Sequence, residues 1–286
     1  MEGKRAFILG ISGIIGQNLA LELKKRGWEV SGAARFSDPD KREIFRQNGI
    51  ETAVFDVTRD DPADLPPADV VFLEIWDPTR PDLIWPINYF GVGRVVERYA
   101  GEADFVNGCT INVYGATAEQ PDESFPCRPD TEYGRSRYSQ ERLIDYFCER
   151  SGSRAIHIRY AHANTAENGI VRRMADAIVA EKSLGPNPDE RLQVIGLEDF
   201  VRVTAEAVNW LDRPPAIVNC CHPRVWTKRE LAEALHERLG YGKVIFDRET
   251  GGLEESVYAD SKRMIDWFGE PQVSVETILQ RVADRF

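Results

Sequence analysis

The sequence predicts an α/β protein built on a doubly wound parallel sheet, and the first thirty-odd of its 286 residues carry that prediction. An apolar run over 6–9 is typical of a buried strand, and it stops at Gly10. Apolar residues then recur at close to helical spacing until Gly27, where a helix is expected to end. A second strand is expected over 29–34. Strand, glycine turn, helix and strand form the βαβ unit of a Rossmann-type sheet.

Three glycines follow the first strand as Gly10-x-x-Gly13-x-x-Gly16. Gly10 permits a tight turn, Gly13 lets the backbone approach a pyrophosphate, and Gly16 lets the helix pack on the strand. The N–H groups and the positive dipole end of the helix then face the phosphates. Because the motif stands between a strand and a helix, it predicts a dinucleotide site. The residues expected to bind the cofactor here are Gly10, Ser12, Gly13, Ile14, Ile15 and Gly16.

The end of the second strand indicates which dinucleotide binds. NAD-binding units usually place an acidic residue there to hold the ribose hydroxyls. Here Ala34 takes that position and Arg35 follows it. A guanidinium can bind a 2′-phosphate with two hydrogen bonds, so NADP(H) is favoured over NAD(H). The alternative is that Arg35 is a solvated loop residue and that Asp38 or Asp40 turns back to the ribose.

Strands and helices continue to alternate beyond this unit. Asp56 and Val57 follow a third strand, at a place where an Asp either meets the adenine amino group or caps a helix. Trp76 begins a proline-containing loop at the carboxyl end of a fourth strand, where ligands bind. Asn88 begins a helix, and Asp56, Val57 and Asn88 are also expected to bind the cofactor. The expected strands are 51–55, 69–75, 104–107 and 154–160, and the expected helix is 88–99.

A second group of motifs lies over 109–142. Thr110 stands four residues before Tyr114 of a V-Y-G motif, and Tyr133-Gly134-Arg135-Ser136-Arg137 lies in a predicted helix. Together with the glycine turn, Asp56 and Asn88, these motifs resemble the extended branch of the short-chain dehydrogenase/reductase superfamily. That branch is the NAD(P)-dependent sugar epimerase and dehydratase group. The resemblance is continuous over 4–160 and looser beyond.

The resemblance implies that Tyr133 is the catalytic acid and base and that Thr110 orients the substrate oxygen. The family places a lysine four residues after this tyrosine, where the chain has Arg137. A cation one turn away favours the phenolate of a group whose pKa is otherwise near 10. Arg137 keeps the charge but cannot lose its proton, so it supports cofactor positioning and not a proton relay. Tyr138 with Arg142 repeats the spacing and is the rival to Tyr133.

The C-terminal third predicts a small, mostly helical substrate-binding region. An amphipathic helix is expected over 169–182, and Thr227 with Glu230 forms a capping box for a helix that ends at Leu239. No basic cluster suggests a second diphosphate, so a small polar carbonyl or alcohol, such as a free sugar derivative, fits better than a sugar nucleotide. The candidate substrate contacts are Trp76, Asn112, Tyr114 (alternatively a structural residue), His162 and Arg202.

Composition limits the remaining classes of function. The net charge of -11 argues against nucleic-acid binding, which needs a basic face. No apolar run is long enough to span a membrane, and the N-terminus lacks a signal-peptide profile. The five cysteines show no C-x-x-C spacing, which favours a reduced cytoplasmic protein without structural zinc.

The sequence therefore predicts an NADP(H)-dependent oxidoreductase that transfers hydride between the nicotinamide and a small-molecule substrate. A dinucleotide-binding domain over 1–160, with later strands near 194–220, is expected to interleave with a substrate-binding region over 161–286. One alternative is an epimerase or dehydratase that retains its cofactor. Another is an NADP-binding protein with impaired catalysis. The resemblance also implies a homodimer through the helices that begin near Asn88 and Tyr133.

Overall fold

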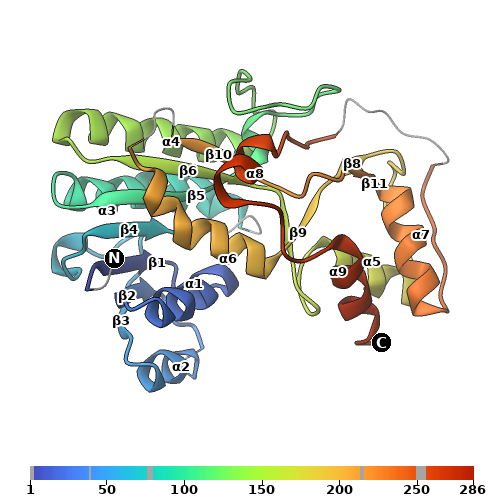
Figure 1. The fold of residues 1–286 in the computed structure, drawn as a ribbon, viewed down its shortest axis with the longest axis horizontal. Helices are drawn as coiled ribbons and strands as arrows, with labels where there is room; N and C mark the ends of the chain where they lie inside the picture. Colours follow the sequence, from blue (N-terminus) through green and yellow to red (C-terminus); the bar gives the residue numbers. More distant parts are fainter. Residues whose placement is uncertain (1–2, 39, 76–79, 213–215, 249–255) are drawn as a thin grey trace. The chain divides into compact units, whose positions relative to one another are not determined.

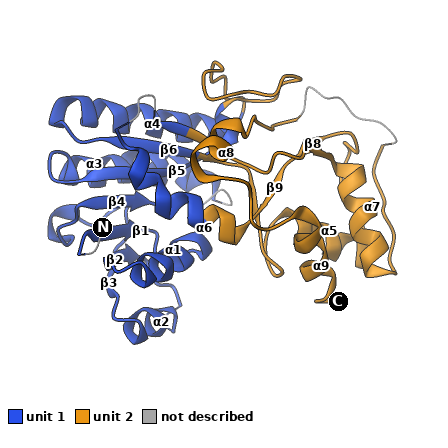
Figure 2. Cartoon of the chain, in the orientation of Figure 1, with its two compact units in different colours: residues 1–113, 131–158, 201–217 blue, residues 114–130, 159–200, 218–286 orange. Residues whose placement is uncertain are grey.

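The fold is seen in a computed structural model that describes residues 3–38, 40–75, 80–212, 216–248 and 256–286. The chain forms two compact units, each made of several separate segments (Figure 2). Unit 1 comprises residues 1–113, 131–158 and 201–217, and unit 2 comprises residues 114–130, 159–200 and 218–286. The chain therefore leaves and re-enters each unit more than once.

A seven-stranded sheet, most of whose strands belong to unit 1, has the strand order β10-β6-β5-β4-β1-β2-β3 (Figure 1). The first strand, β1, pairs in parallel with β2 on one side and with β4 on the other. The strand order therefore reverses at β1, which is where open α/β sheets bind ligands. The strands are β1 Arg5–Leu9, β2 Glu29–Ala34, β3 Glu51–Val54, β4 Val70–Leu73, β5 Asp104–Thr110, β6 Ala155–Tyr160 and β10 Ile217–Cys220.

Helices cover both faces of this sheet, as a doubly wound fold requires. The α-helices that pack on it are α1 Ile14–Lys25, α2 Lys41–Gln47, α3 Val92–Tyr99, α4 Glu132–Ser151 and α6 Leu197–Glu206. Apolar residues of α3 and α4 share one core with Phe7, Leu9 and Phe105 of the strands. On the other face, Arg26 at the end of α1 pairs with Glu206 of α6 at 3.3 Å, so α6 lies beside α1.

Local sequence explains where the main helices of this unit begin and end. Lys24 and Lys25 complement the negative end of α1. In α4 the Thr131 side chain accepts a hydrogen bond from the Gly134 N–H, and Gly152 ends the helix with φ 79°. These signals come from residues close in sequence, and helices α1 and α4 begin and end where the signals lie.

Several elements differ from the sequence-based expectation in extent, among them the strand expected over 69–75, observed as Val70–Leu73, and the helix expected over 169–182, observed as Ile170–Val179. The helix expected over 88–99 is preceded by a π-helical turn, η3 Pro86–Gly91, and becomes α-helical only in α3. The strand expected over 104–107 continues as far as Thr110. Asn107 and Gly108 interrupt its apolar pattern, but both are buried and the strand continues through them. Short 3₁₀ turns lie at Pro62–Asp64, Pro81–Leu83, Ile111–Val113 and Ala207–Trp210.

Unit 2 has its own core and two small sheets. Helix α5 packs with α7 and α9 through residues such as Met174, Leu235 and Ile278. Thr227 and Glu230 form the predicted capping box at the start of α7. The elements are α5 Ile170–Val179, α7 Lys228–Leu239, α8 Lys262–Phe268 and α9 Val275–Ala283, with β7 His162–Asn164 paired to β9 Val194–Gly196 and β8 Arg191–Leu192 paired to β11 Trp226–Thr227. Among the helices of the described residues, none has the length and apolar character to cross a membrane.

Candidate active site

The carboxyl ends of β1 and β4 meet at the glycine turn. Gly10 has φ +88°, and a Cβ built on it would lie 2.4 Å from the carbonyl oxygen of Glu74. A Cβ on Gly16 would lie 2.4 Å from the carbonyl oxygen of Gly10. Any side chain at either position would force the strand end or α1 to move. This is the geometry that the predicted tight turn and close helix packing require.

Helix α1 presents its N-terminus at the same turn. Gly13 is its N-cap, is exposed, and has no side chain to accept hydrogen bonds from the first helical turn. The first N–H groups of a helix lack intrahelical partners, and the helix dipole attracts an anion there. Ser12 is half-buried, Ile14 is 43% exposed, and Ile15 is buried beneath the turn. The turn therefore fits a pyrophosphate group.

Positive charge lies beyond the end of β2. Arg35 is exposed, and Lys41 Nζ donates a hydrogen bond to the Ser12 carbonyl oxygen at 3.4 Å. Burial acts to raise the pKa of Asp56, but hydrogen bonds from Thr58 and the charges of Arg59 and Arg35 outweigh it and hold that pKa below its ordinary value. Arg35 is thus close enough to Asp56 to influence its titration.

Asp56 and Val57 lie after β3, as the sequence predicts. The Asp56 carboxylate accepts hydrogen bonds from the Thr58 N–H at 3.0 Å and from the Thr58 hydroxyl at 2.7 Å. It therefore closes a local turn, and among the described residues no helix begins there for it to cap. Val57 is buried, and a Cβ on Gly91 of η3 would lie 2.6 Å from its carbonyl oxygen.

Asn88 ties η3 to the start of α4. Its side-chain amide nitrogen donates to the Ser136 hydroxyl at 3.0 Å, and that hydroxyl donates to the Tyr133 carbonyl oxygen at 2.8 Å. Asn88 is completely buried, and its Oδ1 has no hydrogen-bond partner among the described residues. The contacts seen therefore support the position of Tyr133.

The side chains of Tyr133 and Thr110 lie close enough for Thr110 to influence the pKa of Tyr133. Thr110 ends β5 and is 7% exposed, and its hydroxyl also accepts from the N–H of Asn112 at 3.2 Å. Burial raises the pKa of Tyr133 to about 12, because the nearby charge of Arg137 and the hydrogen bond from Thr110 only partly oppose it. At neutral pH Tyr133 is therefore a phenol, which can donate a proton.

Arg137 is completely buried one helical turn after Tyr133. Its Nη1 donates to the carbonyl oxygen of Ile75 at 3.1 Å and to Gln140 Oε1 at 2.7 Å. Its Nη2 donates to the carbonyl oxygen of Gly108. The guanidinium is therefore anchored to the main chain just beyond β4 and within β5. Ile75 and the glycine turn both follow the carboxyl ends of their strands.

The predicted substrate residues lie in different surroundings. Asn112 is half-buried in the turn after β5. Tyr114 is 2% exposed, accepts a hydrogen bond from Arg159 at 2.9 Å and donates one to Asn219 Oδ1 at 2.7 Å. Burial raises its pKa above the ordinary value for tyrosine. These buried contacts favour the alternative that Tyr114 is a structural residue.

The remaining candidates divide between the two units. His162 begins β7 in unit 2, and burial lowers its pKa. Arg202 belongs to α6 in unit 1 and faces Glu206 at 3.8 Å. Trp76 lies outside the described residues.

Sequence reasoning missed several polar residues behind this site. Gln140 and Asn107 are completely buried, and His157 is 2% exposed. Gln140 stands three residues after Arg137, so it occupies the same side of α4. That spacing was the available signal, and Asn107 within an apolar strand was a second one.

Comparison with known proteins places this geometry in a family. The model of the NAD dependent epimerase/dehydratase family matches residues 6–220. A curated relative, the "Putative UDP-glucose 4-epimerase" of Methanocaldococcus jannaschii, is 22% identical over 182 residues. That match covers 60% of this chain and 59% of the relative, so it spans less than two thirds of the relative's length.

Solved structures share the fold over nearly the whole chain. A variant of UDP-glucuronic acid 4-epimerase from Bacillus cereus, in complex with UDP-4-deoxy-4-fluoro-glucuronic acid and NAD, has 17% identity and a TM-score of 0.84, with 98% of both chains covered. UDP-glucose 4-epimerase from Thermotoga maritima with UDP-glucose has 19% identity and a TM-score of 0.82, with 98% of this chain and 97% of that chain covered. A dTDP-glucose 4,6-dehydratase from Bacillus anthracis in complex with NAD has 15% identity and a TM-score of 0.80, with 99% and 96% covered.

Proposed function

The chain belongs to the NAD-dependent epimerase/dehydratase family, and on that basis we propose that it transfers hydride between NADP(H) and a small polar carbonyl or alcohol. The observation that supports the proposal is the placement of Tyr133 near Thr110 and one helical turn from the buried charge of Arg137. A proton donor, a hydrogen-bonding partner and a fixed cation are what carbonyl reduction requires of the protein.

Each residue of this group has a separate task. When bound, the nicotinamide supplies or accepts the hydride. Tyr133, protonated at neutral pH, donates its proton to the carbonyl oxygen, and Thr110 orients that oxygen. Arg137 offsets the negative charge left on the phenolate and keeps its own proton throughout. In the oxidation direction Tyr133 must first lose its proton, so that direction is expected to speed up as pH rises.

The preference for NADP(H) rests on the charges beyond β2. Arg35 is exposed where an acidic residue would otherwise hold the ribose, and Lys41 reaches the glycine turn at Ser12. Two cations near one site favour a phosphate over bare hydroxyl groups. Two of the cited solved structures are described in complex with NAD, so the proposed preference for NADP(H) rests on this chain's own residues and not on those neighbours.

Calorimetric titration with NADP(H) and NAD(H) tests the cofactor proposal. Arg35→Ala is expected to weaken NADP(H) binding about tenfold to a hundredfold and to leave NAD(H) binding unchanged, since one charge-assisted contact is lost. Arg46→Ala is the matched control, because Arg46 is an exposed arginine of the neighbouring α2 that pairs with Glu43. Tighter binding of NAD(H), or no effect of Arg35→Ala, would refute the preference.

The second candidate function is epimerisation or dehydration with a retained cofactor. The family match and the fold shared with 4-epimerases over 98% of the chain favour it. The two functions differ in whether cofactor is consumed. Net oxidation of NADPH with a carbonyl substrate supports the first, whereas protein purified with bound cofactor that converts a sugar without net NADPH change supports the second.

We also propose a homodimer and a cytoplasmic location. Phe90 in η3 is 64% exposed and Tyr146 on α4 is 52% exposed, on the two elements through which pairing is expected. Sedimentation should show a dimer that Phe90→Asp weakens.

The proposed cytoplasmic location rests on the cysteines. All five are free thiols, which suits a reducing compartment. Residues 161–286 are proposed to form mainly a substrate-binding region, in which His162 is the first residue to test.

A further inference from the structure

A line of polar side chains crosses the apolar core of unit 1, starting at Arg137. Its guanidinium donates to Gln140 Oε1 at 2.7 Å, and Gln140 Nε2 lies 2.7 Å from Asn107 Oδ1. Asn107 Nδ2 lies 3.0 Å from His157 Nδ1, and His157 Nε2 lies 3.0 Å from a carboxylate oxygen of Asp145. Every link is within hydrogen-bond distance, and all but the last residue are almost completely buried.

The chemistry of these groups allows only one direction for the hydrogen bonds. Arginine can only donate, so Gln140 must turn its oxygen towards Arg137 and its nitrogen towards Asn107. Asn107 then accepts through its oxygen and donates through its nitrogen to His157 Nδ1. That nitrogen must therefore carry no proton, and the proton of a neutral His157 sits on Nε2. Every donor points from the cation at Arg137 to the anion at Asp145.

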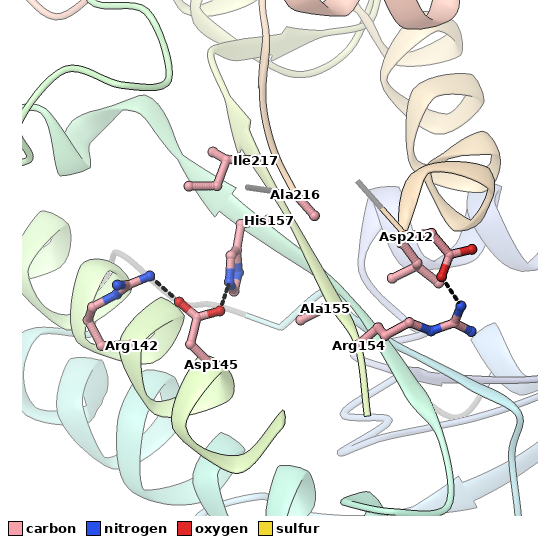
Figure 3. Close-up of a pocket in the computed structure, with 9 residues that line it drawn as sticks. Arg142, Asp145, Arg154, Ala155, His157, Asp212, Ala216 and Ile217 are labelled. Atoms are coloured by element: carbon pink, nitrogen blue, oxygen red, sulfur yellow. Dashed lines mark hydrogen bonds and ion pairs between the residues drawn. The ribbon is translucent and has the colours of Figure 1, made fainter. Parts of the chain in front are cut away.

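The far end of the line opens on a pocket of about 430 Å³ (Figure 3). Asp145 lies there between Arg142 and His157 and is hydrogen-bonded to both. Arg154 also lines the pocket and pairs with Asp212. Burial acts to raise the pKa of Asp145, but hydrogen bonds and charges of His157 and Arg142 outweigh it and hold that pKa below its ordinary value. The carboxylate therefore stays ionised at neutral pH and accepts the last hydrogen bond.

We infer that His157 and Asp145 are positioning residues for Arg137, which they orient through Asn107 and Gln140. The importance of this orientation for catalysis rests on the proposed function. If His157 Nδ1 carried a proton, Asn107 and Gln140 would both have to turn over. Gln140 would then face Arg137 with a second donor, and Arg137 has no acceptor to offer. The presence of a proton on His157 Nδ1, next to the pocket, is thereby coupled to the position of the Arg137 guanidinium near Tyr133.

Nitrogen-15 NMR of the histidine side chains tests the direction of the line. The chain has four histidines, and a His157→Asn spectrum identifies the signal of His157. We expect neutral His157 with its proton on Nε2 in the wild type and in Arg137→Lys, since lysine also only donates. Gln140→Glu should reverse the line, because a carboxylate accepts from both neighbours, and should convert His157 to the doubly protonated form. An unchanged His157 signal in Gln140→Glu would overturn the inference.

Cofactor titration of His157→Leu and His157→Asn tests positioning itself. Leucine removes the acceptor for Asn107, and we expect nicotinamide cofactor affinity to fall about tenfold, the loss typical of a hydrogen bond to a charged group. Asparagine can place its oxygen near the position of Nδ1, so His157→Asn should recover most of that loss. Equal affinity in His157→Leu and the wild type would show that the line does not position Arg137.

A separate readout distinguishes failure of the inference from failure of the proposed function. If the wild type binds no nicotinamide cofactor, the proposed function falls. Rotation of the Arg137 guanidinium, followed by NMR of its Nη groups, then decides the inference. Rotation that is slow in the wild type and His157→Asn but faster in His157→Leu supports positioning. The same rate in all three proteins overturns it.

Discussion

Arg137 can bind several oxygen atoms at once, and its surroundings use that capacity. The guanidinium contacts carbonyl oxygens of Ile75 and Gly108 and the side chain of Gln140. A lysine ammonium is a compact charge without the planar fork that matches such a set. The arginine thus keeps the cation of the family motif and anchors it to the main chain just beyond β4 and within β5.

Arg137→Lys is therefore expected to lower the free energy of unfolding by about 1–3 kcal/mol, because it leaves at least one buried oxygen without its donor. Urea denaturation measures this change. Arg135→Lys is the matched control, since Arg135 is exposed on the same helix and its replacement should have little effect. Equal losses in the two variants would show that the oxygen contacts of Arg137 contribute nothing specific.

Tyr133 and Tyr138 compete for the catalytic role on α4, and the structure distinguishes their surroundings. Tyr133 meets Thr110 and the charge of Arg137, whereas the Tyr138 ring lies under the guanidinium of Arg142. Tyr133→Phe is expected to reduce the rate of hydride transfer about a hundredfold to ten-thousandfold with cofactor affinity unchanged, because only the proton donor is lost. Steady-state kinetics of Tyr133→Phe beside Tyr138→Phe measure it. A larger loss in Tyr138→Phe would transfer the role to that residue, and unchanged activity in both variants would show that neither tyrosine is the proton donor.

At the scale of elements, the glycine turn sets how closely α1 approaches the sheet. A Cβ on Gly16 would lie 2.4 Å from the Gly10 carbonyl oxygen, whereas the nearest atom to a Cβ on Gly13 is 3.3 Å away. Gly16→Ala should therefore cost about 1–3 kcal/mol of unfolding free energy, as overpacking does. Gly13→Ala should change it by no more than about 0.5 kcal/mol.

Dinucleotide titration separates the two glycines further. Gly13→Ala should weaken binding while stability is kept, because the new Cβ stands where the pyrophosphate approaches. Gly16→Ala should weaken binding together with stability, because α1 moves. Normal dinucleotide affinity in stable Gly13→Ala would contradict a phosphate site at this turn.

At the scale of the whole molecule, several ionised carboxylates support the fold at neutral pH. Hydrogen bonds from Arg5 lower the pKa of Asp69, and those of His157 and Arg142 outweigh burial at Asp145. A carboxyl whose pKa is lower in the folded protein stabilises it above its unfolded pKa, and that stability is lost as pH falls through the folded pKa. Acid should therefore destabilise the protein progressively.

Asp145→Asn tests the share of one carboxylate. The difference in unfolding free energy between wild type and variant is expected to be largest near pH 7 and to shrink below about pH 4, where the wild-type carboxyl takes up a proton. Urea denaturation across this range measures it. Asp212→Asn is the control, because the Asp212 side chain is 80% exposed and its ion pair should contribute little. A difference that does not change with pH would exclude the ionised carboxylate as its source.

The two units show why some features were predictable from the chain alone. The glycine turn, the helix after it and the capping box of α7 depend on neighbours a few residues apart, so their signals are local. The interleaved course of the chain through both units depends on contacts between distant segments. The hydrogen-bond partners of Tyr114 are likewise distant in sequence, namely Arg159 and Asn219, and no local sequence pattern predicts these contacts.

Short stretches of sequence predict the doubly wound sheet, the glycine turn and the candidates Thr110 and Tyr133, because periodicity, glycine spacing and motifs are local signals. The burial of Arg137 against the main chain of Ile75 and Gly108, and its link through Gln140 and Asn107 to His157, become visible only once distant segments are brought together. The physical reason is that a buried polar group must find its partner in space, and parallel strands bring that partner from distant parts of the chain.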